Sequence, residues 1–148
     1  MLHILVGENA AREDWEDCVR RGRPISWIVP KAAAPGDDVI FVFNRDQFIG
    51  TGVIASEPEP ATFLGQPAFR ADVRDLKQFR RPLAVADVAP RIPDWAWPRS
   101  YTKGRTTPKD GISRKLWGIV SEHADRVDLV PSLGTETRPR EPGRTANR

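Results

Sequence analysis

Cationic side chains gather in one part of the chain. Residues 91–115 hold seven basic residues and only two acidic ones, whereas the whole 148-residue chain has a formal charge of only +3. The seven are Arg91, Arg99, Lys103, Arg105, Lys109, Arg114 and Lys115. Such clustering is typical of a surface that attracts a polyanion. The alternative is a solvated, loop-rich face without a partner.

Five tryptophans supply flat side chains that could stack on a ligand. Trp15 and Trp117 recur with other apolar residues at helical spacing, so we expect both in the core. Trp27 follows a helix break and precedes a loop, so its indole fits a pocket as well as a core. Trp95 and Trp97 flank one alanine and point to the same side if the segment is extended. They could cover the sheet or close a pocket.

Residues for catalysis are few. Neither His3 nor His123 has a nucleophile or a carboxylate at a recognisable spacing. Cys18 lies on an acidic helical segment that disfavours its thiolate, and one cysteine with two histidines makes no disulfide or metal cluster. Gly50 and Gly52 lack the third glycine of a dinucleotide-binding motif. We therefore expect no enzymatic activity, no metal and no cofactor.

Short elements must position these residues, because 14 prolines and 11 glycines interrupt the chain. The apolar run at 3–7 predicts a first strand. Apolar residues at three- and four-residue spacing predict a helix over 10–21 with Asn9 as its cap. A short apolar segment follows at 25–29, closed by Pro30.

A hairpin is the clearest pattern in the chain. The turn residues 35–38 precede a β-branched and aromatic strand at 39–44, and 45–47 connect it to a returning strand at 48–56. Two glycines alternate in the second strand, which permits a bend or the close approach of another group.

The later segments complete an α+β domain over 1–134. They are a strand, a helical turn, a long irregular stretch, a helix and a last strand, at 68–76, 83–88, 92–108, 111–124 and 126–130. This order predicts a small curved antiparallel sheet or open barrel flanked by two or three helices. Residues 135–148 are rich in Pro, Arg and Thr and predict a disordered basic tail.

The order of these signals resembles the PUA-like fold, and within it the EVE, YTH and SRA-like modules that read modified nucleobases. The similarity is carried by Ser26-Trp27 and Pro30-Lys31, the turn 35–37, the strand 39–43 and the Gly-x-Gly strand 48–56. The second half is similar to EVE-like domains beside HNH nucleases in modification-dependent restriction proteins. The motif shared with those domains is Trp-x-Trp-Pro followed by Tyr-Thr, which corresponds to residues 95–98 and 101–102 of this sequence.

This resemblance implies a reader that binds a base everted into an aromatic pocket, with a modified cytosine in DNA as the expected target. A tryptophan placed like Trp27 forms one wall of the cage in YTH domains. The implied pocket residues are Trp27, Ser26, Asn44, Trp95, Trp97 and Tyr101. The implied phosphate-binding residues are Arg99, Lys103, Arg105, Lys109 and Arg23.

Two alternatives stay open. The same fold could bind RNA or a modified RNA base, or the chain could be a small regulatory domain whose aromatic loop packs on a protein. We expect a cytoplasmic protein that binds no membrane, since no long apolar run or signal peptide occurs. No His-Asn-His pattern occurs either, so cleavage would come from a separate nuclease domain or subunit.

Overall fold

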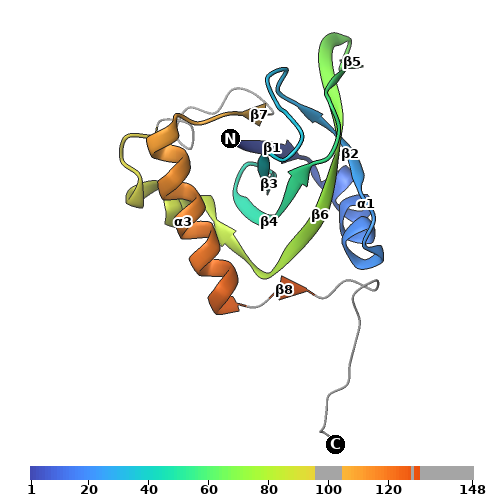
Figure 1. The fold of residues 1–148 in the computed structure, drawn as a ribbon. Coiled ribbons are helices and arrows are strands. Elements are labelled where there is room, and N and C mark those ends of the chain that lie inside the picture. The colour runs from blue at the N-terminus through green and yellow to red at the C-terminus, as the bar shows by residue number, and fades with distance from the viewer. Residues whose placement is uncertain (96–104, 128, 131–148) are drawn as a thin grey trace, which may run out of the picture.

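The structure, a computed structural model, describes residues 1–95, 105–127 and 129–130. Its strands are β1 (Leu2–Gly7), β2 (Ile25–Val29), β3 (Asp38–Phe43), β4 (Gln47–Ile54), β5 (Glu59–Phe63), β6 (Gln66–Ala84), β7 (Arg105–Thr106) and β8 (Leu129–Val130). Its helices are α1 (Asn9–Arg21), α2 (Val85–Val88) and α3 (Asp110–Val127), with a short 3-10 turn, η1 (Ala89–Arg91). One sheet holds all the strands in the order β2-β6-β4-β3-β1-β7, with β5 and β8 paired to β6. It curls into an open half-barrel (Figure 1), which confirms the α+β class.

The predicted hairpin is confirmed as the antiparallel pair of β3 and β4. Its glycines allow β6 to pass close by: a β-carbon at Gly50 would lie 2.0 Å from the carbonyl oxygen of Lys77. One at Gly52 would lie 2.7 Å from a methyl carbon of Val73. The register between β4 and β6 shifts at two places, and Asp75 has a φ of 52° beside one of them. Such irregularities bend a strand, and this bending curls the sheet.

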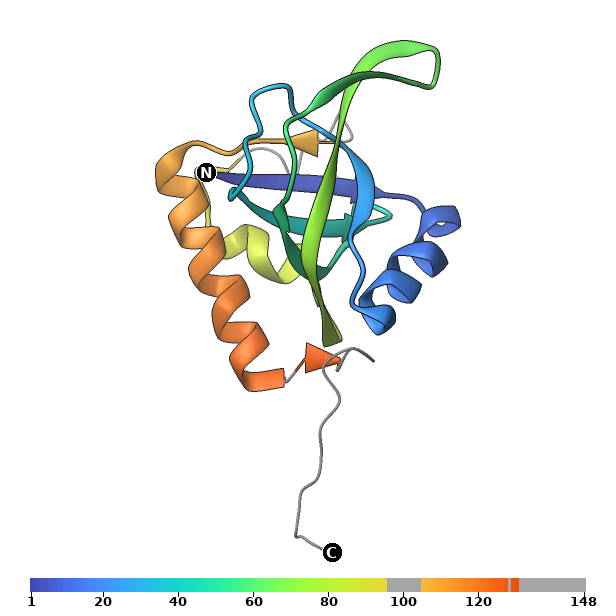
Figure 2. The same cartoon turned by 45° about the vertical axis from the view of Figure 1, so that its right-hand side comes forward.

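Each face of the curled sheet carries its own apolar core. The strand β3 serves both, because Phe41 and Phe43 point into one cluster while Ile40 and Val42 point into the other. Trp15 of α1 belongs to the first cluster. The second cluster takes side chains from α2 and α3, namely Val85, Val88, Leu116, Ile119 and Val120. Figure 2 shows α1 and α3 on opposite sides of the sheet.

Three elements differ from the sequence prediction. No strand was expected between residues 56 and 68, yet β5 pairs with β6 in a hairpin. An edge strand needs only one row of hydrogen bonds and tolerates Pro60, so its polar composition hid it. The strand β6 runs to Ala84 rather than ending at 76, and α3 continues to Val127, which leaves β8 only two residues. The predicted tail at 135–148 lies outside the described residues.

Candidate nucleic-acid interface

Trp27 is a core residue at the edge of the sheet. Its ring meets Phe41 and Phe43 edge to face, at centroid distances of 5.4 and 6.0 Å, and only 9% of the residue is exposed. The indole Nε1 donates to the carbonyl oxygen of Val6 at 3.4 Å. Gly7 makes room for this packing, because a β-carbon there would lie 2.1 Å from Phe43 and 2.8 Å from Trp27. The sequence allowed Trp27 to lie in a pocket or in the core, and in this structure it lies in the core. A base could stack on its ring only after local movement.

Ser26 does not face the same way as Trp27. Consecutive strand residues point to opposite sides of a sheet. Ser26 is accordingly exposed, and its hydroxyl oxygen accepts a hydrogen bond from Arg70 Nη1 at 3.2 Å. The two residues therefore do not line one pocket in this structure.

Asn44 does lie at the same end of the sheet as Trp27. Its backbone N–H donates to Gly7, and its side-chain Nδ2 donates to Asn9 Oδ1 at 2.7 Å. Asn9 was expected only as a helix cap, but it is the first residue of α1, and Glu8 occupies the cap position without a side-chain cap bond. Both amides are exposed, so their remaining donors and acceptors are available to a ligand.

Arg12 completes this group from the first turn of α1. Its guanidinium lies 5.9 Å from the centroid of the Phe43 ring and also pairs with Glu16. We call the six residues at this place the β1-end cluster: Gly7, Asn9, Arg12, Trp27, Phe43 and Asn44. Sequence reasoning did not place Asn9 and Arg12 beside Trp27 and Asn44, although the short link between β1 and α1 brings the first turn of the helix beside the end of that strand.

The two tryptophans assigned to one pocket lie in different cores. Trp95 is 4% exposed and packs in the cluster under α2 and α3, whereas Trp27 belongs to the cluster under α1. The structure therefore does not bring Trp27 and Trp95 together. Trp97 and Tyr101 lie outside the described residues, so their assignment to the pocket stays a prediction.

The predicted phosphate-binding residues fall in three groups. Arg99 and Lys103 lie outside the described residues. The backbone of Arg105 pairs with Leu5 in the sheet, and Lys109 is exposed just before α3. Arg23 is exposed on the other side, between α1 and the edge strand β2.

A second basic region around β2 and β6 was not singled out from the sequence. Residues 20–31 contain Arg20, Arg21, Arg23 and Lys31 and no acidic residue, and β6 contains five basic residues against two acidic ones. Within the described part of the chain, Arg23, Lys31 and Arg70 form no ion pair, and all three are exposed. We call these three the basic edge. The acid-free run of residues 20–31 is the signal that could have revealed it.

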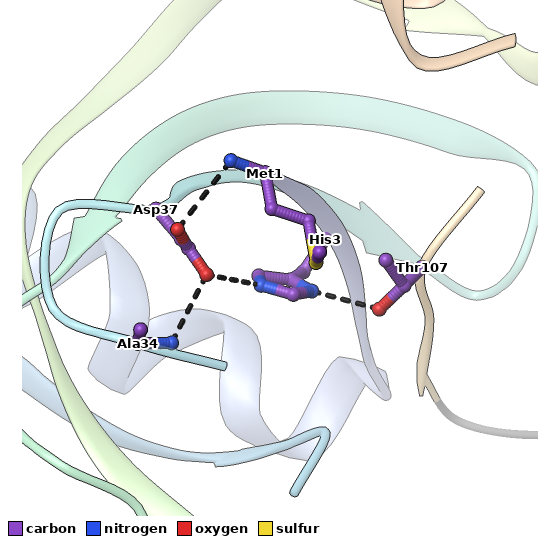
Figure 3. Close-up of polar contacts among 5 residues, drawn as sticks. All are labelled: Met1, His3, Ala34, Asp37 and Thr107. Atoms are coloured by element: carbon purple, nitrogen blue, oxygen red, sulfur yellow. Dashed lines mark hydrogen bonds and ion pairs between the residues drawn. The ribbon is translucent and has the colours of Figure 1, made fainter. Parts of the chain in front are cut away.

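His3 is the centre of a hydrogen-bonded group that the sequence did not reveal. Its side chain is fully buried, with Nε2 2.8 Å from Asp37 Oδ2 and Nδ1 2.8 Å from Thr107 Oγ1 (Figure 3). A carboxylate only accepts, so in the neutral ring Nε2 carries the proton and Nδ1 accepts from the threonine hydroxyl. Sequence spacing showed no carboxylate or nucleophile beside His3, and the fold supplies a carboxylate and a hydroxyl from positions 34 and 104 residues away.

Asp37 accepts further hydrogen bonds in the same group. The backbone N–H of Ala34 donates to it at 3.0 Å, and the N-terminal ammonium lies 3.4 Å from its Oδ1. Burial raises the pKa of Asp37, but the hydrogen bond from His3, that from Ala34 and the positive terminus outweigh burial and hold the pKa below its ordinary value. A carboxylate, an imidazole and a hydroxyl also occur in this order in hydrolase triads. Here the buried ring joins β1 to the turn before β3 and to the segment after β7.

Other reactive groups in the described residues are few. Burial raises the pKa of the Cys18 thiol, and the neighbouring Asp17 and Asp14 raise it further, against the opposing effect of Arg23. Across residues 1–95 and the described part of 105–130, no three His, Cys, Asp or Glu side chains gather as a metal site. Over the same ranges, no helix is long and apolar enough to cross a membrane.

Among the comparisons with known proteins, the one with solved structures bears on the fold. No family model and no curated protein matches this sequence. The structure is similar to the NMR structure of Rpa0253 from Rhodopseudomonas palustris, with a TM-score of 0.62, 17% identity, and coverage of 86% of this chain and 94% of that one. It is also similar to the crystal structure of ASCH from Zymomonas mobilis, with a TM-score of 0.55, 10% identity, and coverage of 80% and 94%. A point mutant of the Zymomonas protein gives a TM-score of 0.53 at 10% identity. The chain thus has the PUA-like fold seen in an ASCH domain.

Proposed function

We propose that this protein is a binding module for nucleic acid and not an enzyme, and that its preferred ligand is DNA carrying a modified base such as a modified cytosine. The observation that carries the proposal is the basic edge, in which Arg23, Lys31 and Arg70 are exposed and free of ion pairs among the described residues. Exposed cations without an ion pair gain the most binding free energy from phosphate contacts, because phosphate binding breaks no existing ion pair and releases counterions. The likeness to an ASCH domain supports a PUA-like binding module.

The β1-end cluster supports the preference for a modified base. It combines the rings of Trp27 and Phe43 with the exposed amides of Asn9 and Asn44. An everted base needs aromatic surface to replace its former stacking and amides or hydroxyls to read its edge. In this proposal Trp27 moves to give one wall, and Trp97 or Tyr101 supplies the second, as in an EVE-type reader.

Binding measurements on matched oligonucleotides test this function. Fluorescence anisotropy would compare a DNA duplex containing 5-methylcytosine, the unmodified duplex and an RNA of the same sequence, each over a range of salt concentrations. We expect the modified duplex to bind most tightly and affinity to fall steeply with salt. Equal affinity for both duplexes would contradict base reading, and tighter binding of RNA would contradict the DNA preference.

Charge variants locate the interface in the same assay. Arg70→Ala should weaken binding to all sequences and reduce the salt slope by about one for each phosphate group that the variant no longer binds. Arg91→Ala is the matched control, because Arg91 is also exposed but pairs with Glu122 of α3 at 3.5 Å. If both variants bind like the parent, the basic edge is not the interface.

A further inference from the structure

The hairpin of β5 and β6 carries an apolar tip. Among the described residues, large hydrophobic side chains are exposed only at Met1, Phe63 and Leu64, and the last two are adjacent. Phe63 is 44% exposed and Leu64 is 84% exposed. Figures 1 and 2 both show this hairpin projecting beyond the rest of the sheet. Exposing two large apolar side chains at a projecting tip is unfavourable in water, so the tip needs an explanation.

The backbone of the tip is also strained at the apolar residue. Phe63 and Gln66 are the last paired residues, so Leu64 and Gly65 form a two-residue turn. Their φ angles are 52° and 76°, and positive φ at both positions is the requirement of a type I′ turn. Glycine adopts this conformation readily and asparagine tolerates it, but leucine does so at a cost. Leu64 is therefore unfavourable in two ways: its backbone adopts a strained conformation, and its apolar side chain is exposed to water. Strain of this kind concentrates at functional sites.

The base of the hairpin lies beside the basic edge. Arg70 is on β6 opposite Glu59, and the ammonium of Lys31 lies 5.7 Å from the ring of Phe69 on the same strand. Glu57 and Glu59 lie at the base of β5, and Asp72 of β6 is a third exposed acidic residue, two positions beyond Arg70. The tip itself, residues 62–67, carries no charge. Cations near the base and a neutral apolar tip suit a ligand with charged phosphates outside and stacked bases inside.

The hairpin is long enough to reach stacked bases. Residues 62–67 are all exposed, and Ala68 is the first buried residue of β6. At about 3.4 Å per residue, the two paired steps from Ala68 to Gln66 span about 7 Å, and the turn at Leu64 and Gly65 extends the tip beyond them. The grooves of B-DNA are about 7.5 to 8.5 Å deep, so the tip could pass the phosphates and meet the base pairs.

We propose that Phe63 and Leu64 form a wedge that inserts between base pairs of a DNA duplex and helps to evert the base that the β1-end cluster reads. Leucine and phenylalanine are among the side chains that proteins insert into base steps to unstack them. Eversion leaves a gap in the stack, and an apolar side chain filling it offsets the stacking that the duplex gives up. This inference rests on the proposed function, since it supplies the step by which a duplex base would reach that cluster.

The decisive variant is Leu64→Asn. Asparagine followed by Gly65 is a preferred sequence for a type I′ turn, so the variant should fold and melt roughly 1–4 °C above the parent. It should nevertheless bind the 5-methylcytosine duplex about fivefold or more weakly, while binding the corresponding single strand equally well, because a single strand needs no wedge. Leu64→Met is the matched control: it keeps an apolar tip and the same backbone demand, and should bind the duplex like the parent.

A duplex with 2-aminopurine beside the 5-methylcytosine reports eversion directly, because its fluorescence rises when it unstacks. The parent and Leu64→Met should raise this signal, and Leu64→Asn should not. A Leu64→Asn protein with unchanged duplex affinity and an unchanged fluorescence rise would overturn the wedge and leave the proposed function intact. If Leu64→Asn abolishes self-association of the parent in sedimentation experiments but leaves its DNA binding unchanged, the wedge is also overturned and the proposed function stands. A parent that binds neither duplex nor single strand would overturn both proposals.

Discussion

His3 Nε2 lies 2.8 Å from Asp37 Oδ2, although the two residues are 34 positions apart in the chain. The bond crosses from β1 to the turn before β3, next to the parallel pairing of these two strands. On its other side the ring reaches Thr107, which follows β7. A single buried imidazole thus joins the start of the chain to the segment that returns after residues 96–104.

Removing this imidazole should destabilise the fold. We expect His3→Leu to lower the free energy of unfolding by about 1–3 kcal/mol, because Asp37 and Thr107 would be left without their shared partner. Thr107→Ser keeps the hydroxyl and should stay close to the parent. Urea unfolding measures both variants, and a His3→Leu protein as stable as the parent would show that these hydrogen bonds contribute nothing.

The lowered pKa of Asp37 makes stability depend on pH. A carboxyl with a lower pKa in the folded than in the unfolded state stabilises the fold fully above its unfolded value, 3.8, and this contribution is lost as the pH falls through the folded pKa. Asp37→Asn should therefore be less stable than the parent at neutral pH, and the difference should shrink below about pH 4. A difference that stays constant between neutral and acidic pH in urea titrations would argue against this linkage.

Gly7 should be intolerant of any side chain. Gly7→Ala should lower stability by about 1–3 kcal/mol, because its β-carbon would overlap the rings of Phe43 and Trp27. Gly118→Ala is the control: a β-carbon there meets nothing within 4 Å, and alanine in α3 should raise stability by about 0.5–1 kcal/mol. Thermal unfolding that ranks the two variants in the opposite order would refute the packing argument.

Trp27 separates core packing from base reading. Trp27→Ala should lose about 3–5 kcal/mol of stability, as for any buried large aromatic residue. Trp27→Phe should remain folded by circular dichroism yet lose most of the preference for 5-methylcytosine, because a smaller ring stacks less. If a folded variant at this position discriminates modified DNA as well as the parent, Trp27 belongs to the core only.

Asn44 offers a test that spares the fold. Its φ of 54° favours glycine, so Asn44→Gly should keep or raise stability while removing the amide bonded to Asn9. If these amides read the base edge, the variant should lose preference for the modified duplex and retain its salt-dependent binding. Unchanged preference in the anisotropy assay would remove Asn44 from the site.

The sequence alone determined the elements whose signal is local. Periodic apolar residues define α1 and α3, and the β-branched run beside Gly50 and Gly52 defines the β3–β4 hairpin, because spacing within one element needs no distant partner. The fold class followed from their order. The strand β5 escaped detection, since an exposed edge strand containing Pro60 has the composition of a loop.

Tertiary structure decided which residues share a place. His3 gained Asp37 and Thr107 only because β1 pairs with both β3 and β7. Alternation along β2 separated Ser26 from Trp27, and the two faces of one sheet separated Trp27 from Trp95. Such relations depend on strand pairing and on which face each residue occupies. Neither is encoded in the spacing of residues within a single element, so no local pattern could have revealed them.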